Sequence, residues 1–179
     1  HNTSIKNQKD LLLAEKTQKY YELYFKFFPE TKNSETLKYS YAEYLLQINL
    51  FQKSFEYYFQ IIKTSKDKAL IKKAAFSSII ALEKLKNPIG IDENENKTEN
   101  SSLPKESKTS SKNSSPFNIN NNLLQVYSIF LEYEKDTPKA LDILLRKAKL
   151  LFDLSNYNEA RTIFTELIYK YSDKEEAVF

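Results

Sequence analysis

The sequence predicts an all-α protein, built as an α-α superhelix of about seven antiparallel helices. Three observations lead to this fold class. Among 179 residues there are one Gly and five Pro, which leaves few turn residues for the hairpins of an all-β fold. Apolar residues recur at helical spacing along most of the chain. One pattern of apolar and small residues also recurs at a fixed offset along the sequence.

Helices are expected throughout residues 5–85. The first runs from Ile5 to Phe28 and ends at Pro29, because proline cannot continue a helix. Its last turns are apolar nearly all round, so we expect neighbouring helices to cover it on more than one side. The next three helices are expected at 34–50, with Ser34 as the N-terminal cap, at 51–64 and at 67–85.

Residues 86–118 differ in composition from the rest of the chain. From Lys86 to Pro116 the sequence has few large apolar residues and mixes Ser, Asn, Lys and Glu. Such a segment cannot bury enough surface to offset the entropy lost on ordering. We interpret residues 86–118 as a disordered polar insertion within one continuous solenoid. We expect it to serve as a spacer, with a binding role as the alternative.

Helical periodicity resumes in residues 119–179. Helices are predicted at 119–134, at 138–154 and at 157–171. Pro138 suits the first turn of its helix, where no backbone donor is needed. Lys174 and the residues after it are predicted to begin a further helix.

Two stretches of the chain superimpose at an offset of 106 residues, so that Ala42 falls on Ala148. They read YSYAEYLLQINLFQKSFEYYFQ from Tyr39 and LRKAKLLFDLSNYNEARTIFTE from Leu145. The helix at 67–85 repeats the first half once more, with its small residue 33 positions after Ala42. Small residues at such positions allow two helices to approach closely. We therefore expect the following residues to be buried at helix contacts: Ala42, Ala75, Ala148 and Ala160.

The segments Phe51–Ser54 and Tyr157–Ala160 each place an aromatic residue at a turn and a small residue three positions later. Together with the repeated alanines and with Pro29 and Pro138, this pattern resembles the tetratricopeptide repeat. The resemblance implies helix pairs stacked into a superhelix. The sequence departs from the family pattern in having no Trp, in having Asn49 where the family turn prefers Gly, and in the insertion.

A second resemblance concerns location. The succession FKFFPET, YSYAEYLL, KKAAFSSIIALEKL and NYNEARTIFTELIYKYSD looks like bacterial envelope repeat proteins of the outer-membrane assembly, division-site lipoprotein and gliding-motility type. This resemblance implies a location in the periplasm or at the outer membrane. Because the sequence has no Met, we expect a processed or excised product, with any signal peptide or lipid anchor lying upstream. No apolar run approaches the roughly 18 residues needed to span a bilayer.

Residues suited to catalysis are few. The chain has no Cys, which excludes disulfides and thiolate chemistry, and its one His is His1. The one Gly, Gly90, lies in the insertion, so there is no Gly-rich phosphate loop. Carboxylate pairs such as Glu132 with Glu134 lie in polar contexts and are interpreted as solvated acids. We expect no enzymatic activity, no cofactor and no metal site.

Charge and aromatic content favour a protein partner over a nucleic acid. The net charge is +3, with 27 Lys plus Arg against 24 Asp plus Glu, and the signs alternate along the helices. The densest basic cluster, Lys63–Lys73, has no Arg-rich recognition pattern beside it, so we expect no nucleic-acid partner. The aromatic stretch Tyr20–Phe28 is expected to pack between repeats rather than stack on bases.

The family resemblance also implies a binding surface. First helices of each pair line the inner face of such a superhelix, which typically forms a groove for a peptide or a helix. On the family pattern the inward positions are Tyr39, Glu43, Leu46, Lys72, Phe76, Ile79, Leu145, Lys149 and Phe152. The aromatic members are expected to be partly exposed on one continuous face, whereas Tyr58, Phe164 and Leu167 should be buried. An ordinary exposed helix face without a ligand is the alternative.

The function predicted from the sequence is a scaffold for protein–protein interaction within a bacterial envelope assembly, with a protein or a peptide as partner. The alternative is a repeat segment of a larger regulator or enzyme whose catalytic domain lies outside these residues. The sequence itself does not name the partner.

Overall fold

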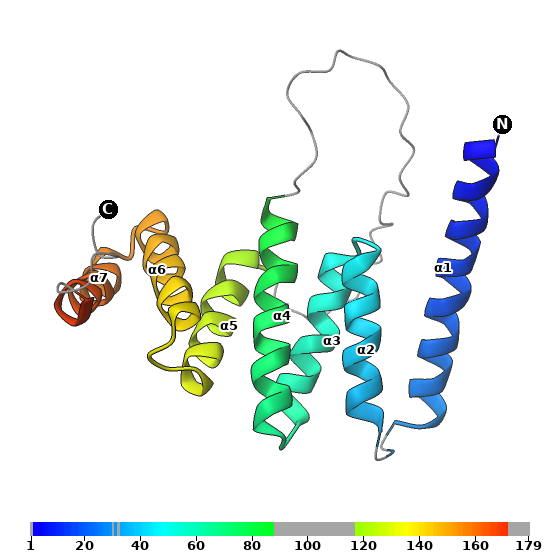
Figure 1. The fold of residues 1–179 in the computed structure, drawn as a ribbon, viewed down its shortest axis with the longest axis horizontal. Coiled ribbons are helices and arrows are strands. Elements are labelled where there is room, and N and C mark those ends of the chain that lie inside the picture. The colour runs from blue at the N-terminus through cyan, green and yellow to red at the C-terminus, as the bar shows by residue number, and fades with distance from the viewer. Residues whose placement is uncertain (1, 30, 32, 88–116, 172–179) are drawn as a thin grey trace, which may run out of the picture.

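The computed structural model describes residues 2–29, 31, 33–87 and 117–171. Over these residues the chain is all-α and forms seven helices, which confirms the predicted fold class (Figure 1). Their bounds are α1 Asn2–Phe27, α2 Ser34–Gln47, α3 Phe51–Thr64, α4 Lys68–Lys86, α5 Ile119–Tyr133, α6 Pro138–Asp153 and α7 Tyr157–Tyr171. None of the described helices has the length and apolarity needed to cross a bilayer.

The helices follow one another in a row, from α1 at one end to α7 at the other (Figure 1). From α2 onward each helix packs against the next, and the core lies between successive helices. Most of the predicted insertion, residues 88–116, lies outside the described residues. Its two ends belong to helices, because Lys86 closes α4 and Asn118 caps α5. The further helix expected after Lys174 also lies outside the described residues.

The turns after α2 and α6 have the same geometry, which confirms the internal repeat. Asn49 and Ser155, 106 residues apart, both have a positive φ, of 63° and 62°. In each turn the backbone amide that follows this residue donates a hydrogen bond to the carbonyl five residues before it. Leu50 N donates to Leu45 O, and Asn156 N donates to Leu151 O, both at 2.9 Å. A left-handed residue ends a helix, so α2 stops at Gln47 and not at 50 as expected.

Caps define the starts of the helices. Asp67 accepts hydrogen bonds from the backbone amides of Ala69 and Leu70, at 2.8 and 3.3 Å, as expected for the start of α4. Thr137 caps α6, and Pro138 occupies its first turn as predicted. The expectation that Ser34 caps α2 was wrong. Ser34 lies inside the helix, and its hydroxyl donates to the Pro29 carbonyl at 2.8 Å across the α1–α2 connection.

Small residues lie where the helices cross. All four alanines expected at helix contacts are buried, namely Ala42, Ala75, Ala148 and Ala160. Beside Ala42, the buried Ser54 hydroxyl on α3 donates to the Ala42 carbonyl on α2 at 2.8 Å, a contact that requires close approach of the two helices. Tyr58 and Leu167 are buried as expected. Phe164 is half-buried and not buried as expected, because no described helix follows α7 to cover it.

Helix α1 is covered on one side. Its inner face stacks on α2 and α3: the rings of Tyr21 and Tyr41 are 4.6 Å apart, and those of Phe25 and Tyr57 are 5.8 Å apart. The expectation that neighbours cover α1 on more than one side was wrong, because α1 lies at the end of the described row (Figure 1). Its exposed large hydrophobic residues are Leu12, Leu13, Tyr20, Leu23 and Phe27.

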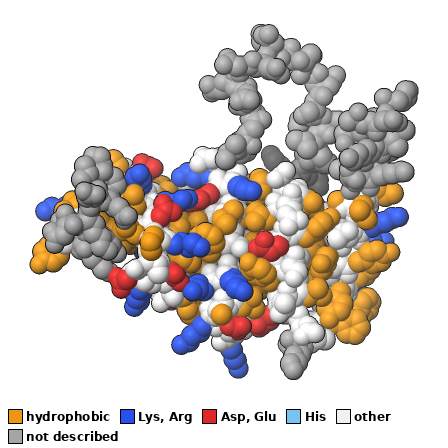
Figure 2. Space-filling model, in the orientation of Figure 1, with side chains coloured by type: hydrophobic (Ala, Val, Ile, Leu, Met, Phe, Trp, Pro, Cys, Tyr) orange, Lys and Arg blue, Asp and Glu red, His pale blue; other side chains and the backbone are white. Residues whose placement is uncertain are grey.

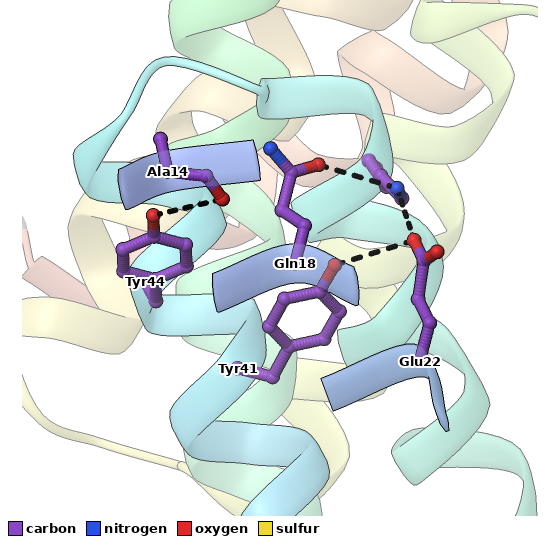
Figure 3. A network of polar contacts seen from close by, with 6 residues as sticks. Ala14, Gln18, Glu22, Tyr41 and Tyr44 are labelled. Carbon is purple, nitrogen blue, oxygen red and sulfur yellow. Dashed lines mark hydrogen bonds and ion pairs between the residues drawn. The ribbon is translucent and has the colours of Figure 1, made fainter. Parts of the chain in front are cut away.

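Glutamates join helices that are two apart in the row. Glu22 on α1 accepts a hydrogen bond from the Tyr41 hydroxyl on α2 at 3.4 Å and forms an ion pair with Lys53 on α3 (Figure 3). In the same region the Tyr44 hydroxyl donates to the Ala14 carbonyl at 3.4 Å. A single carboxylate therefore connects α1, α2 and α3.

The same arrangement occurs twice more in the described part of the chain. Glu43 on α2 accepts hydrogen bonds from the Tyr58 hydroxyl on α3 and from Ser77 Oγ on α4, the latter at 3.0 Å. The third group consists of Glu83 on α4, Tyr127 on α5 and Arg146 on α6. We call these three groups the three-helix clamps. In each clamp a buried tyrosine obtains the acceptor that its hydroxyl requires.

Replacing Ala148 with Leu should lower the free energy of unfolding by roughly 1–3 kcal/mol, because extra methylene groups overpack a fully buried helix contact. Chemical denaturation followed by circular dichroism measures the change. The matched control is Ala69→Leu, which adds the same side chain at an exposed position of α4 and should leave stability nearly unchanged. Equal stability of the two variants would contradict the helix register.

Candidate binding groove

A groove runs between α4 and α6, above α5. One part is a cavity of about 510 Å³. It is lined by Ile80, Glu83, Lys84, Lys86, Asn87, Leu123, Tyr127, Arg146, Lys149, Leu150 and Asp153. A second cavity, of about 300 Å³, continues it toward Phe76, Lys139 and Asp142. Because the two cavities share Ile80, Glu83 and Arg146, they form one groove.

Helical spacing explains why these residues face each other. On α4, Ile80, Glu83, Lys84 and the C-cap residue Asn87 are each three or four residues from another member of the set, and therefore lie on one face of the helix. On α6 the same relation places Lys139, Asp142, Ile143, Arg146, Lys149, Leu150 and Asp153 on the opposing face. Both walls thus mix apolar and charged side chains.

The third clamp crosses the groove. Glu83 accepts a hydrogen bond from the Tyr127 hydroxyl at 2.9 Å and from Arg146 at 2.8 Å. Arg146 also pairs with Asp142 at 2.8 Å, one turn earlier on its own helix. Burial and the Glu83 charge raise the pKa of Tyr127, so its hydroxyl remains a neutral donor. The clamp fixes the position of α6 relative to α4, although the two helices are not neighbours in the row.

The rim of the groove is positively charged. Glu83 and Asp142 are both paired with Arg146, which compensates one of their two negative charges. Lys86 and Lys149 have no ion-pair partner among the described residues. Lys84 contributes a further cation, and Asp153 is the remaining acid of the lining. On the face shown in Figure 2, Lys and Arg side chains lie among hydrophobic ones.

The predicted inward residues of α2 take part in internal contacts. Tyr39 is half-buried, and its hydroxyl is 3.1 Å from Ser77 Oγ. Glu43 belongs to the second clamp, so its carboxylate is already engaged. Leu46 is half-buried against the main core. None of these residues lines the α4–α6 groove.

On α4 the predicted residues have three different surroundings. Lys72 pairs with Glu134 at 2.7 Å, outside the groove. Phe76 lines the groove, half-buried, with Lys139 Nζ 4.2 Å above its ring. Ile79 also lines the groove, although its side chain is only 1% exposed. It belongs to the main core, because its side of α4 packs on α5.

On α6 the structure brings one of the three predicted residues to the groove. Lys149 is exposed on the rim. Leu145 and Phe152 do not line the groove. Phe152 is 56% exposed and its ring lies 5.2 Å from that of Tyr157. Because Phe152 follows Lys149 by three residues, it lies beside the groove on α6.

Sequence reasoning missed the residues at the centre of the groove, Glu83, Tyr127 and Arg146. The sequence contained one signal for them. Tyr127 lies within an apolar helical stripe, so its hydroxyl needs a hydrogen-bond acceptor, and Glu83 lies one turn after the apolar Ile79 on another helix. The choice of acceptor depends on how the helices cross, which the sequence pattern does not specify. Within the described residues no group of three His, Cys, Asp or Glu side chains could hold a metal ion.

Comparisons with protein-family models, with curated protein sequences and with solved structures found no match to this chain.

Replacing Tyr127 with Phe should lower the free energy of unfolding by roughly 1–3 kcal/mol, since it removes a hydrogen bond to a charged acceptor. Thermal and chemical denaturation measure the loss. The control is Tyr169→Phe, which removes a hydroxyl from a tyrosine that is 89% exposed. If both variants unfold at the same denaturant concentration as the parent chain, the clamp does not stabilise the fold.

Proposed function

We propose that this chain is a protein-interaction module and that the α4–α6 groove binds a segment of a partner protein. One observation supports the proposal most strongly: the groove combines apolar walls, a fixed charged floor and lysines that lack ion-pair partners among the described residues. Binding sites for peptides are typically grooves of this kind, with apolar anchoring positions and a few polar groups that fix orientation.

The charges of the groove suggest the chemistry of the partner segment. Ile80 is partly exposed and offers apolar contact to aliphatic or aromatic side chains, above the buried Leu123 and Leu150. Lys84, Lys86 and Lys149 surround these contacts and favour carboxylate groups over cations. The proposed ligand is therefore a peptide segment in which Asp or Glu residues flank apolar ones.

The sequence resemblance to tetratricopeptide proteins supports the same conclusion, because that family commonly binds peptides along the first helices of its pairs. Here α4 and α6 are the corresponding first helices. The resemblance to bacterial envelope repeat proteins extends the proposal to location, with the chain acting as a scaffold in the periplasm or at the outer membrane. This extension depends on the sequence resemblance alone.

Selection of peptides from a random display library on the immobilised chain tests the proposal. The recovered peptides should combine apolar and acidic residues. Their affinity, measured by fluorescence anisotropy, should fall about tenfold or more in the variant Lys86→Glu/Lys149→Glu, because two favourable charge contacts become repulsive. Binding should also weaken as salt is added.

Charge reversal at two exposed positions outside the groove, Lys66→Glu/Arg161→Glu, provides a control with the same change in net charge. This variant should bind the selected peptides as the parent chain does. Recovery of no peptide, or equal binding to both double variants, would contradict the proposal. Loss of binding in Phe152→Ser alone would place the binding surface around Phe152 and Tyr157 instead of in the groove.

A further inference from the structure

The two ends of the α4–α6 groove differ in charge. The lining of the larger cavity contains four cations and two acids, namely Lys84, Lys86, Arg146 and Lys149 with Glu83 and Asp153. The lining of the smaller cavity contains two of each, namely Lys139 and Arg146 with Glu83 and Asp142. The excess positive charge therefore belongs to the larger cavity, which lies at the C-terminal end of α4. Acidic groups of a ligand are favoured at that end.

The chain leaves α4 at this charged end of the groove. Asn87, the C-cap of α4, is itself part of the cavity lining. Its φ of −126° and ψ of 81° lie outside the helical region, as expected for a residue that precedes a proline. The segment that begins at Pro88 is therefore tethered directly to the cavity. Since four extended residues span up to about 14 Å, the residues that follow Asn87 are within reach of the lysines on the rim.

Residues 88–96 have the composition that this end of the groove favours. They read PIGIDENEN, in which two isoleucines precede three acids and no basic residue occurs. Of residues 88–116, these nine hold two of the three large apolar residues and three of the five acids, so both kinds are concentrated next to the cavity. Pro88 and Gly90 are residue types that favour turns, which suits a segment that folds back toward its own helix.

We propose that residues 88–96 occupy the α4–α6 groove of their own chain and compete there with the partner segment. This inference rests on the proposed function, because it assigns a regulator to the same site. When the segment is docked, its acids meet Lys86 and Lys149 on the rim, and its isoleucines contact the partly exposed Ile80. A partner protein binds the groove by displacing this segment.

The tether makes weak docking effective. A segment joined to its site by a few residues has an effective concentration on the order of 1 mM at that site. With an intrinsic Kd of about 0.1 mM, the segment occupies the groove about nine-tenths of the time. A competing peptide then finds only about a tenth of the grooves open, so its apparent affinity falls about tenfold. The segment thus sets a threshold that only a tighter or more concentrated partner passes.

Fluorescence anisotropy of a labelled synthetic peptide, PIGIDENEN, titrated with the full 179-residue chain tests the proposal. One variant disables the segment at constant length through five changes: Ile89→Ser, Ile91→Ser, Asp92→Ser, Glu93→Ser and Glu95→Ser. This serine variant should bind the peptide about tenfold more tightly than the parent chain does, because its groove is open. Adding Lys86→Glu/Lys149→Glu to the serine variant should abolish the binding. Circular dichroism should show unchanged helicity in all variants.

The control, Glu15→Ser/Glu99→Ser/Glu106→Ser, removes three acids outside the segment, so it changes the net charge equally and should bind the peptide as the parent chain does. Equal binding to the parent chain and to the serine variant overturns the proposal. So does a serine variant that binds no peptide, or binding that persists after the two lysine reversals. In each case, library-selected peptides whose binding still depends on Lys86 and Lys149 would leave the proposed function intact.

Discussion

A tyrosine hydroxyl buried between helices must find an acceptor, because leaving it without one forfeits a hydrogen bond that water would otherwise supply. In the described part of this chain, Tyr41, Tyr58 and Tyr127 meet this requirement in the same way. Each donates to a glutamate on the preceding helix, and that glutamate also binds a donor on the helix that follows. Every clamp therefore fixes the relative positions of three consecutive helices, which adjacent-helix packing alone does not do.

The proposed binding groove depends on this constraint. The third clamp places Arg146 across the groove, where it pairs with Glu83 and Asp142, and the lysines of the rim make the lining net positive. At the other end of the row, the first clamp holds α1 by its inner face through Glu22. That attachment leaves the outer face of α1 exposed.

The fold class, the repeat and most helix bounds could be predicted from local signals: helical apolar spacing, Pro138 at a helix start, and small residues such as Ala148 at crossings. The errors have a common cause. The exposure of an apolar residue depends on which neighbour covers it, so Phe164 is half-buried where burial was expected, and the outer face of α1 is open where cover was expected. The groove was partly anticipated through Phe76, Ile79 and Lys149. The centre of the groove was missed, because the Glu83–Arg146 pair depends on how α4 and α6 are placed relative to each other.

Titration of the tyrosines by ultraviolet absorbance, with circular dichroism recorded at each pH, tests the clamps most directly. Burial, together with the neighbouring glutamate charge, raises the pKa of Tyr41, Tyr58 and Tyr127 in the folded chain. Since the unfolded chain releases these protons near pH 10, stability should be intact below about pH 10 and fall as the pH rises further. The clamp tyrosines should ionise only as the helical signal is lost. If all 13 tyrosines ionise together near pH 10 with the helices intact, the clamps do not exist as described.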